Sequence, residues 1–356
     1  MRILVLNCGS ATVKFKLFQK ANEGLTEVLQ GMVEVTGKHD QAIAAVLSKL
    51  PESPDVVAHR VVHGGDVYYE PVRIDHDVLE KLRMLKDMAP LHNPPAIRGI
   101  EAAMNLGVPQ VAAFDTAFHS GIPDYAATYA IPVDLAKRLK IRRYGFHGHS
   151  HQYVTEQFAK LTGIAEPTIV TLHLGNGASA AAIRKGRCVD TSMGPTPLEG
   201  LVMGSRPGDM DPAIVLRMLR SGMALDDVEK MLWEQSGLQG LAGEKDMRQL
   251  LARTDEAAQN AIEIFCYRVK KYIGAYAAAL GGVEGLVFTG GIGEKSSEIR
   301  RRIVSGLEFL GFELDPKKNE KCSHFISTGS SKLPILVIPT NEELLIATLA
   351  LSVMER

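Results

Sequence analysis

The sequence has almost no net charge, since its 356 residues include 40 basic and 41 acidic side chains. Proteins that bind nucleic acid or a membrane surface electrostatically carry a marked excess of basic residues, so neither partner is expected. The four cysteines lie far apart and form no Cys-x-x-Cys pair, which argues against disulfides and thiolate zinc sites. No apolar run approaches the roughly 20 residues that span a bilayer, and the apolar start is too short for a signal peptide. These absences predict a cytoplasmic protein.

The apolar residues predict an α/β fold, because short apolar runs alternate with helical patterns. A chain of 356 residues is also long for one hydrophobic core, so two domains are expected. Strands are predicted at residues 2–7, 12–18, 55–62, 109–114, 168–174, 285–290 and 334–340. Helices are predicted near residues 75–88, 95–106, 150–161, 212–221, 225–235, 255–280, 295–309 and 341–353. The alanine-rich segment 179–184 suits either state.

Two segments of the chain repeat one local pattern. Residues 3–18 read ILVLNCGSATVKFKLF, and residues 169–186 read IVTLHLGNGASAAAIRKG. Each combines an apolar strand, a polar residue, a glycine turn and a second strand. A duplicated unit would give two related domains that face each other across a cleft. Chance similarity between two hairpins explains the pattern equally well.

Polar clusters follow several predicted strands, at the sheet edge where open α/β sheets bind ligands. Residues 7–14 form a turn of small residues, and its backbone N–H groups with Lys14 could cradle a phosphate. A plain hairpin is the commoner explanation for such a turn. Arg60 lies inside an apolar strand, where its charge needs a partner, either a structural carboxylate or a substrate anion.

Further polar clusters end the later strands. Asp115 follows a buried strand, where a carboxylate holds Mg²⁺ or caps a turn. Residues 175–180 match a loose Gly-x-Gly-x-x-Ala dinucleotide motif, but no long helix follows and Asp190 comes too early. An NAD-dependent oxidoreductase therefore remains a weak alternative. No Gly-x-x-x-x-Gly-Lys-Ser/Thr motif occurs, which excludes an ordinary P-loop NTPase. The turn GGIG, residues 290–293, suits a nucleotide-binding corner before a helix.

Three histidines, His147, His149 and His151, stand two apart in the segment YGFHGHSH. A zinc site would need this segment to stay extended, with the three rings on one face. The surrounding residues instead indicate a loop that enters a helix near Ser150, so a zinc site is not favoured.

Nine short segments of the chain occur in the order found in acetate kinases. They are VLNCGSATVK, HRVVHGG, APLHNPPA, FDTAFH, RRYGFHG, HLGNGAS, DTSMGPTPLEGLVMGSRPGDMDP, FTGGIGE and TNEEL. The chain resembles this family from Asn7 to Glu343. The resemblance implies an α/β fold of two duplicated actin-like (ribonuclease H-like) domains with a cleft between them. The first domain would span residues 1–116 plus 340–356, and the second, residues 117–339.

The resemblance also implies a reaction. The γ-phosphoryl group of ATP would pass reversibly and in line to acetate, giving acetyl phosphate and ADP. The family implies Mg²⁺, for which Mn²⁺ could substitute, and a homodimer. Alternatives are a propionate or butyrate kinase, or a member that binds a nucleotide or acyl phosphate without catalysis. Such a reaction needs no general base, because a carboxylate is already a nucleophile at neutral pH, so catalysis rests on alignment and charge.

Site residues are carried over motif by motif. Catalytic roles are implied for Asn7, Arg60, Asp115, His147 and Arg206. The acyl group would contact Arg60, Val62, Leu91, Phe146 and Pro197. ATP would contact Ser10, Thr12, Lys14, His173, Asn176, Gly177, Asp246, Arg248, Gly291 and Ile292. The metal would be held near Asn7, Asp115 and Glu342.

The chain departs from the family pattern at several positions. Met247 and Lys295 replace the usual Phe and Asn beside the purine, and they leave the nucleotide preference open. His149 and Pro195 lie near the acyl motifs and leave the choice of acid open. Much of the shortening relative to the family falls between Lys14 and Arg60.

Overall fold

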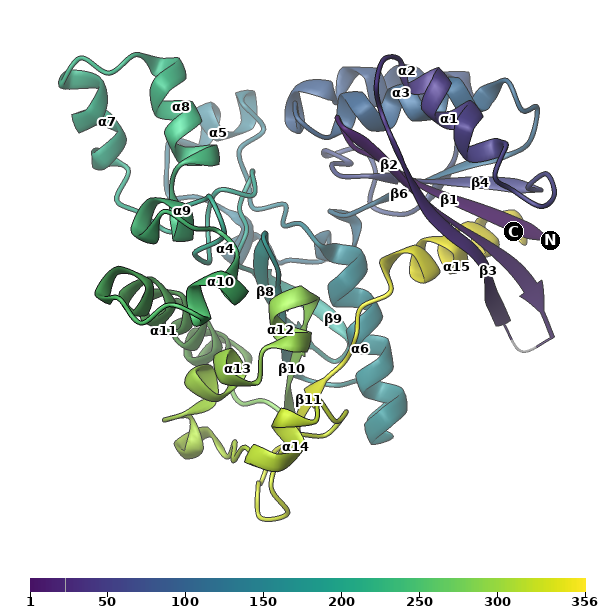
Figure 1. Cartoon of the computed structure of the whole chain (residues 1–356). Coiled ribbons are helices and arrows are strands. Elements are labelled where there is room, and N and C mark those ends of the chain that lie inside the picture. The colour runs from purple at the N-terminus through teal and green to yellow at the C-terminus, as the bar shows by residue number, and fades with distance from the viewer. Residues whose placement is uncertain (23) are drawn as a thin grey trace. The chain divides into compact units, whose positions relative to one another are not determined.

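The computed structural model describes residues 1–22 and 24–356 (Figure 1). The chain forms two compact units. The first unit contains Met1–Ser120 and Asn341–Arg356, and the second contains Gly121–Thr340. Each unit is built around one mixed β-sheet with helices packed on it. The predicted α/β fold is therefore confirmed.

The first unit holds a six-stranded sheet with the order β3-β2-β1-β4-β6-β5. Strand β1 pairs antiparallel with β2 and parallel with β4, and β4 pairs parallel with β6. The strands are β1 (Arg2–Cys8), β2 (Thr12–Ala21), β3 (Gly24–Glu34), β4 (Val56–Val61), β5 (Val72–Arg73) and β6 (Gln110–Phe114). The helices are α1 (His39–Leu47), α2 (His76–Met84), α3 (Asn93–Met104), α15 (Glu342–Met354) and the short 3₁₀ helices η1 (Lys86–Met88) and η2 (Ala117–His119).

Helices cover both faces of this sheet. Ile3 and Val5 of β1 pack with Ile346 of α15, whereas Leu4 and Leu6 pack in a cluster with Ile43 of α1. Because neighbouring residues of a strand point to opposite faces, α15 and α1 lie on opposite sides of the sheet, as Figure 1 shows. The continuous apolar run of β1 is therefore explained by burial on both faces.

The second unit holds a five-stranded sheet with the order β11-β10-β7-β8-β9. Strand β7 pairs antiparallel with β8 and parallel with β10, and β10 pairs parallel with β11. The strands are β7 (Ile169–Leu174), β8 (Ala178–Arg184), β9 (Arg187–Thr191), β10 (Gly285–Thr289) and β11 (Ile335–Val337). Read from β9 to β11, this order repeats β3-β2-β1-β4-β6 strand for strand, including the directions. The predicted duplication is confirmed by this topology.

The helices of the second unit carry most of the polar segments that the sequence singled out. Helix α11 packs on β8, while α6 packs on β7 and β10. The helices are α4 (Asp124–Ala127), α5 (Val133–Arg138), α6 (Gly148–Thr162), α7 (Ala213–Arg220), α8 (Leu225–Glu234), α9 (Gly237–Ala242), α10 (Met247–Leu251), α11 (Glu256–Leu280), α12 (Gly290–Lys295), α13 (Ser297–Val304), α14 (Pro316–Glu320) and the 3₁₀ helix η3 (Glu308–Leu310).

Three local predictions need correction. The ambiguous segment 179–184 is a strand, because it completes β8 between β7 and β9. The predicted turn at residues 290–293 is instead the first turn of α12, which ends at Lys295 before α13 begins at Ser297. The helix predicted near 295–309 is therefore two helices and a 3₁₀ turn. Strand β3, helix α1 and strand β9 were not predicted.

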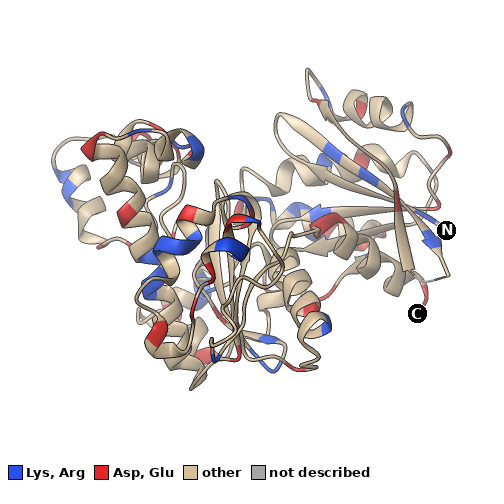
Figure 2. Ribbon diagram, turned by 60° about the horizontal axis from the view of Figure 1, so that its bottom comes forward, with Lys and Arg blue, Asp and Glu red and all other residues tan. Residues whose placement is uncertain are grey.

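Basic and acidic residues are interspersed along the helices and strands of both units (Figure 2). No helix among the described residues has the length and apolarity that a membrane crossing demands.

Candidate active site

Three predicted site residues of the first unit lie at the carboxyl edge of its parallel strands. Asn7 stands near the end of β1, Arg60 near the end of β4, and Asp115 directly after β6. This edge is the usual ligand position in α/β sheets. The sheet topology therefore brings together residues that are more than 100 positions apart in the sequence.

Arg60 and Asp115 form a bidentate ion pair. The guanidinium donates from Nε to Asp115 Oδ1 at 2.9 Å and from Nη2 to Oδ2 at 2.6 Å. Burial opposes the charge on Arg60, but Asp115 and then Glu342 raise the pKa of Arg60 above its ordinary value. Asp115 is 1% exposed, so its carboxylate needs partners such as Arg60 to stay ionised. The sequence left open whether the partner of Arg60 was a carboxylate or a substrate, and here it is a carboxylate.

Helix α15 brings a second carboxylate to this edge. Asn341 caps the helix by accepting the N–H of Leu344 at 3.2 Å, and Glu342 follows in the first turn, as predicted. Lys16 of β2 holds the helix start through Glu343, with Nζ 3.6 Å from the carboxylate. The carboxylates of Asp115 and Glu342 and the amide oxygen of Asn7 are the hard oxygen donors that suit Mg²⁺.

The turn between β1 and β2 contains the predicted phosphate-binding segment. The N–H of Gly9 donates to the carbonyl of Thr12 at 2.8 Å, which closes a tight hairpin. Ser10 is exposed at its tip, and Lys14 pairs with Asn7 across the two strands. The geometry is that of a hairpin, and a phosphate at this turn stays a prediction.

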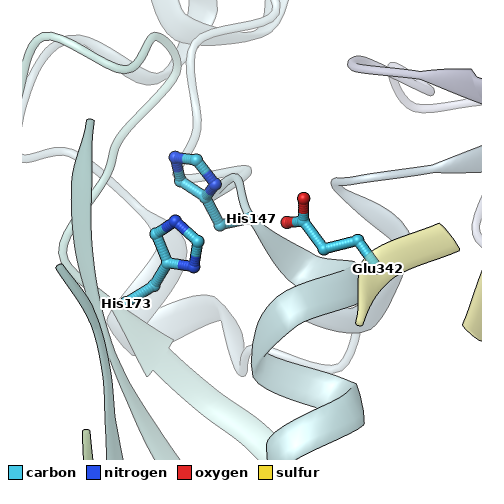
Figure 3. Close-up of side chains that lie close together, drawn as sticks. All are labelled: His147, His173 and Glu342. Carbon is cyan, nitrogen blue, oxygen red and sulfur yellow. The ribbon is translucent and has the colours of Figure 1, made fainter. Parts of the chain in front are cut away.

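In the second unit, His147 is placed by an unusual backbone. It has φ 57, in the left-handed region, and it is the residue before the first turn of α6. Its ring stacks on that of His173, with centroids 4.2 Å apart and planes 17° apart (Figure 3). Nδ1 of His173 lies 2.7 Å from the hydroxyl of Ser150. The third residue drawn in Figure 3, Glu342, belongs to the first unit.

Arg206 approaches the same place. A Cβ atom built on Gly177 would lie 2.9 Å from Arg206 Nη2 and 3.2 Å from His147 Nε2, so both side chains reach the backbone of Gly177. Arg206 donates to the carbonyl of Pro197 at 2.8 Å. Among residues 1–22 and 24–356 it pairs with no carboxylate, and burial lowers its pKa. A desolvated cation without a counter-ion is a strong site for an anion.

The three neighbouring histidines do not form a metal site. The helix begins at Gly148, two residues before the predicted start, so His149 and His151 lie in its first turn while His147 precedes it. His151 is committed to Thr171 and Ser179, with ring nitrogens 2.8 Å and 3.0 Å from their hydroxyls. The segment is therefore not extended, and the zinc alternative is excluded for these residues.

A cavity of about 610 Å³ lies in the second unit between β7, α10 and α12. Five of the predicted nucleotide-binding residues line this cavity. Four lining residues were not predicted. The predicted residues are Asn176, Asp246, Arg248, Gly291 and Ile292. The others are Gly175, Lys245, Leu251 and Ser296, and the departures Met247 and Lys295 also line it.

Within the cavity wall, Asp246 and Arg248 form a closed pair. Arg248 donates from Nε to Oδ1 at 3.0 Å and from Nη2 to Oδ2 at 2.5 Å. These hydrogen bonds lower the pKa of Asp246 to about 2. The cavity thus offers an ionised carboxylate and a fixed guanidinium beside the apolar side chains of Ile292 and Leu251. Such a wall suits the ribose and base of a nucleotide.

The predicted acyl pocket is divided between the units. Val62 and Leu91 belong to the first unit, and Leu91 is 59% exposed. Phe146 and Pro197 belong to the second unit. Phe146 directly precedes His147 in the sequence, and the carbonyl of Pro197 accepts a hydrogen bond from Arg206. The acyl pocket therefore stays a prediction.

The sequence of this chain is similar to that of known acetate kinases over its full length. The sequence model of the Acetokinase family matches residues 45–348. The acetate kinase of Clostridium novyi (strain NT) is 44% identical over 399 aligned positions, which cover 100% of this chain and 99% of the relative. The acetate kinase of Thermotoga maritima is 42% identical, with 100% and 99% covered. An alignment longer than the 356 residues of this chain means that the relatives have segments that this chain lacks.

Solved structures agree in fold. The acetate kinase of Porphyromonas gingivalis superimposes with a TM-score of 0.93 at 37% identity, with 99% of each chain covered. A propionate kinase from Francisella tularensis gives a TM-score of 0.90 at 41% identity, with 98% of each chain covered. The duplicated α/β fold, the full-length sequence identity and the match of the family model together show that this chain belongs to the Acetokinase family of kinases.

Proposed function

We propose that this chain transfers the γ-phosphoryl group of ATP reversibly to acetate, giving acetyl phosphate and ADP. Besides the family to which the chain belongs, the surroundings of Arg206 give the main support for this function. Arg206 is a half-buried cation with no carboxylate partner among the described residues, and it meets His147 at the backbone of Gly177. A transferring phosphoryl group is an anion that needs this combination of a guanidinium, an imidazole and backbone amides.

The reaction would proceed by direct in-line transfer. The acetate carboxylate attacks the γ-phosphorus while the bond to the ADP oxygen breaks, and no proton has to be removed. Arg206 and Arg60 would hold the carboxylate and the migrating group, and His147 would donate a hydrogen bond to the equatorial oxygens. Each such contact contributes roughly 10²–10³ in rate in enzymes of this kind.

The metal proposal rests on the oxygen donors of the first unit. Asn7, Asp115 and Glu342 would hold Mg²⁺, with Mn²⁺ as a substitute, directly or through water. When bound, the ion neutralises charge on the β- and γ-phosphates. Asp115 would keep its contact with Arg60, so that the cation and the metal share one carboxylate.

The nucleotide would bind in the cavity of the second unit. Adenosine would lie against Ile292 and Gly291, with Asp246 and Arg248 at the ribose and purine. The phosphates would extend along His173, Asn176 and Gly177, and along residues 10–14. Met247 and Lys295 line this cavity, so ATP and GTP should be compared in every assay.

Propionate is the second candidate acceptor. The solved propionate kinase from Francisella tularensis shares 41% of its sequence and the whole fold with this chain. An added methylene typically changes discrimination by about 1–3 kcal/mol, so the two acids should be separable in kcat/KM. We keep acetate as the primary substrate because the relatives matched over the full chain are named acetate kinases.

An acid-resolved kinase assay tests this function. Purified protein receives MgATP or MgGTP with acetate, propionate or butyrate, and acyl phosphate is trapped as the hydroxamate. We expect turnover with acetate, less with propionate and least with butyrate, because the proposed pocket is small. Retained ADP binding without hydroxamate from any acid would instead indicate a non-catalytic member of the family. Thermal stabilisation by NAD⁺ and not by ATP would revive the oxidoreductase alternative.

We also propose a homodimer in the cytoplasm, where ATP is available. Helices α7 and α8 expose the apolar side chains of Ile214, Leu216 and Leu225, which are 41%, 51% and 67% exposed. The two helices contact each other, and exposed apolar side chains on neighbouring helices are candidates for an interface. We expect light scattering to give twice the chain mass, and the double variant Leu216→Glu, Leu225→Glu to give the monomer mass with unchanged circular dichroism. A wild-type monomer would contradict the proposal.

A further inference from the structure

The side chain of Glu294 joins the nucleotide loop, defined here as residues 289–295, to the segment that leads into α15. Its Oε1 accepts the N–H of Gly290 at 3.0 Å and the N–H of Thr340 at 3.1 Å. It also accepts the hydroxyl of Thr289 at 3.3 Å. One carboxylate oxygen therefore connects three groups from two segments that are far apart in the sequence.

The nucleotide loop needs this carboxylate at its start. Gly290 has φ +76, and a Cβ there would lie 2.8 Å from the carbonyl oxygen of Leu174, so only glycine fits. Gly290 is also the first residue of α12, where the backbone N–H has no partner within the helix. The Thr289 side chain does not cap the helix, and Glu294 accepts the Gly290 N–H in its place.

A buried arginine fixes the other end of α12. Arg300 is 0% exposed, and its Nη1 donates to the carbonyls of Gly293 and Glu294, each at 2.8 Å. Its Nε donates to Asn319 Oδ1 at 2.7 Å. The C-terminal end of α12 is therefore anchored by Arg300, whereas its first residue is held by the Glu294 side chain, so a displacement of the first turn is passed on to Thr340.

The other partner, Thr340, stands two residues before Glu342. It is the last residue of the second unit, and Asn341 and Glu342 follow it as the cap and first residue of α15. The hydroxyl of Thr340 is buried and has no hydrogen-bond partner among the described residues. The side chain of Thr340 thus supplies no anchor, and its N–H bond to Glu294 fixes this segment to the nucleotide loop.

We propose that Glu294 is a positioning residue for phosphoryl transfer, which fastens the loop that receives the nucleotide to the segment that carries Glu342. Gly291 and Ile292 of the loop line the cavity, so a bound nucleotide orders the loop and, through Glu294, the start of α15. Nucleotide in the cavity and metal at Glu342 then favour each other. This inference rests on the proposed function, because it takes the cavity as the nucleotide site and Glu342 as a metal residue.

The test compares Glu294→Ala and Glu294→Gln with wild type by calorimetry and by turnover. ADP binding is measured with and without Mg²⁺, and adenosine binding reports the cavity alone. In Glu294→Ala we expect the enhancement of ADP affinity by Mg²⁺ and kcat at saturating MgATP each to fall about tenfold. Adenosine affinity should change less than about threefold, since the cavity wall itself is unchanged. Glu294→Gln keeps an oxygen acceptor and should recover most of both losses.

Two further variants separate coupling from local support. In a Glu342→Gln background, Glu294→Ala should lower kcat by less than about twofold, because interacting residues are not additive. The matched control is Glu284→Ala, which removes a carboxylate that accepts the Thr168 N–H at 2.6 Å away from the cavity. The control should leave the Mg²⁺ enhancement at the wild-type value.

The opposite results would overturn the proposal. If Glu294→Ala weakens adenosine binding as much as it weakens MgADP binding, or if its effect persists in the Glu342→Gln background, Glu294 only supports the loop. If circular dichroism shows that Glu294→Ala does not fold, Glu294→Asp replaces it, because the shorter side chain cannot reach both N–H groups. An undiminished enhancement of ADP affinity by Mg²⁺ in Glu294→Asp would contradict the proposal. A wild type that yields no acyl phosphate refutes the proposed function, and the calorimetric comparison still decides the role of Glu294.

Discussion

Replacing Arg206 by alanine should lower kcat for acetyl phosphate formation by about 10²–10³, the usual loss when one electrostatic contact to the transition state is removed. Arg206 is half-buried and, among the described residues, pairs with no carboxylate, so its charge is not consumed within the protein. The charge is directed to the backbone of Gly177, where His147 also arrives. The measurement is the hydroxamate assay at saturating MgATP and acetate.

Two controls make this result specific. Arg206→Lys keeps the charge but loses the planar fork of donors, so it should recover less than about a tenth of the lost rate. Arg184 also donates to a backbone carbonyl, that of Ala279 at 2.7 Å, but it is exposed and lies on β8, so Arg184→Ala should turn over normally. A normal kcat in Arg206→Ala would remove this residue from the reaction. The thermal stability of Arg206→Ala should stay close to that of wild type, because the removed charge is half-buried and has no carboxylate partner among the described residues.

Replacing Arg60 by alanine should damage both activity and stability. The rate should fall by about 10²–10³, as for Arg206. The free energy of unfolding should also fall by about 3 kcal/mol, because Asp115 would be left buried without its cation. Asp115 is 1% exposed and receives both hydrogen bonds of the pair. Denaturant titration measures the second effect.

A double-mutant cycle identifies the cause of the lost stability. Arg60→Ala with Asp115→Ala should be more stable than Arg60→Ala alone, because the uncompensated carboxylate is gone, although it should remain inactive. The solvent-facing pair Arg83 and Glu101, 2.5 Å apart, is the matched control, and its removal should leave the midpoint of denaturant unfolding almost unchanged. Equal stability of Arg60→Ala and wild type would mean that Asp115 does not depend on Arg60.

Elements with clear end signals were predictable from the sequence. Helix α11 was predicted at residues 255–280 and runs over Glu256–Leu280, because Asp255 caps its start and Gly281 ends it in the left-handed region. The segment 179–184 had no such signal, because alanine suits helices and buried strands alike, and pairing with β7 decided its state. Helix α12 was missed because the residue that completes its start, Glu294, lies near its C-terminal end.

The residues of the candidate site were found from short motifs, but their grouping was not. Family motifs named Arg206, His147 and Gly177 separately, and only the fold shows that the first two reach the third. Arg300 stands in the run SEIRRRIV, which has the composition of an exposed helix face, yet Arg300 is fully buried. Sequence patterns indicate which residue types stand at strand ends, whereas contacts between distant segments depend on tertiary packing.

The central claim is that this chain moves a phosphoryl group from ATP to acetate and not to water. The direct measurement is ³¹P nuclear magnetic resonance of one incubation of the purified wild-type protein with MgATP and acetate. We expect acetyl phosphate and ADP in equal amounts, with no early release of inorganic phosphate. ADP with inorganic phosphate from the start, or unchanged ATP beside saturable nucleotide binding, would contradict it.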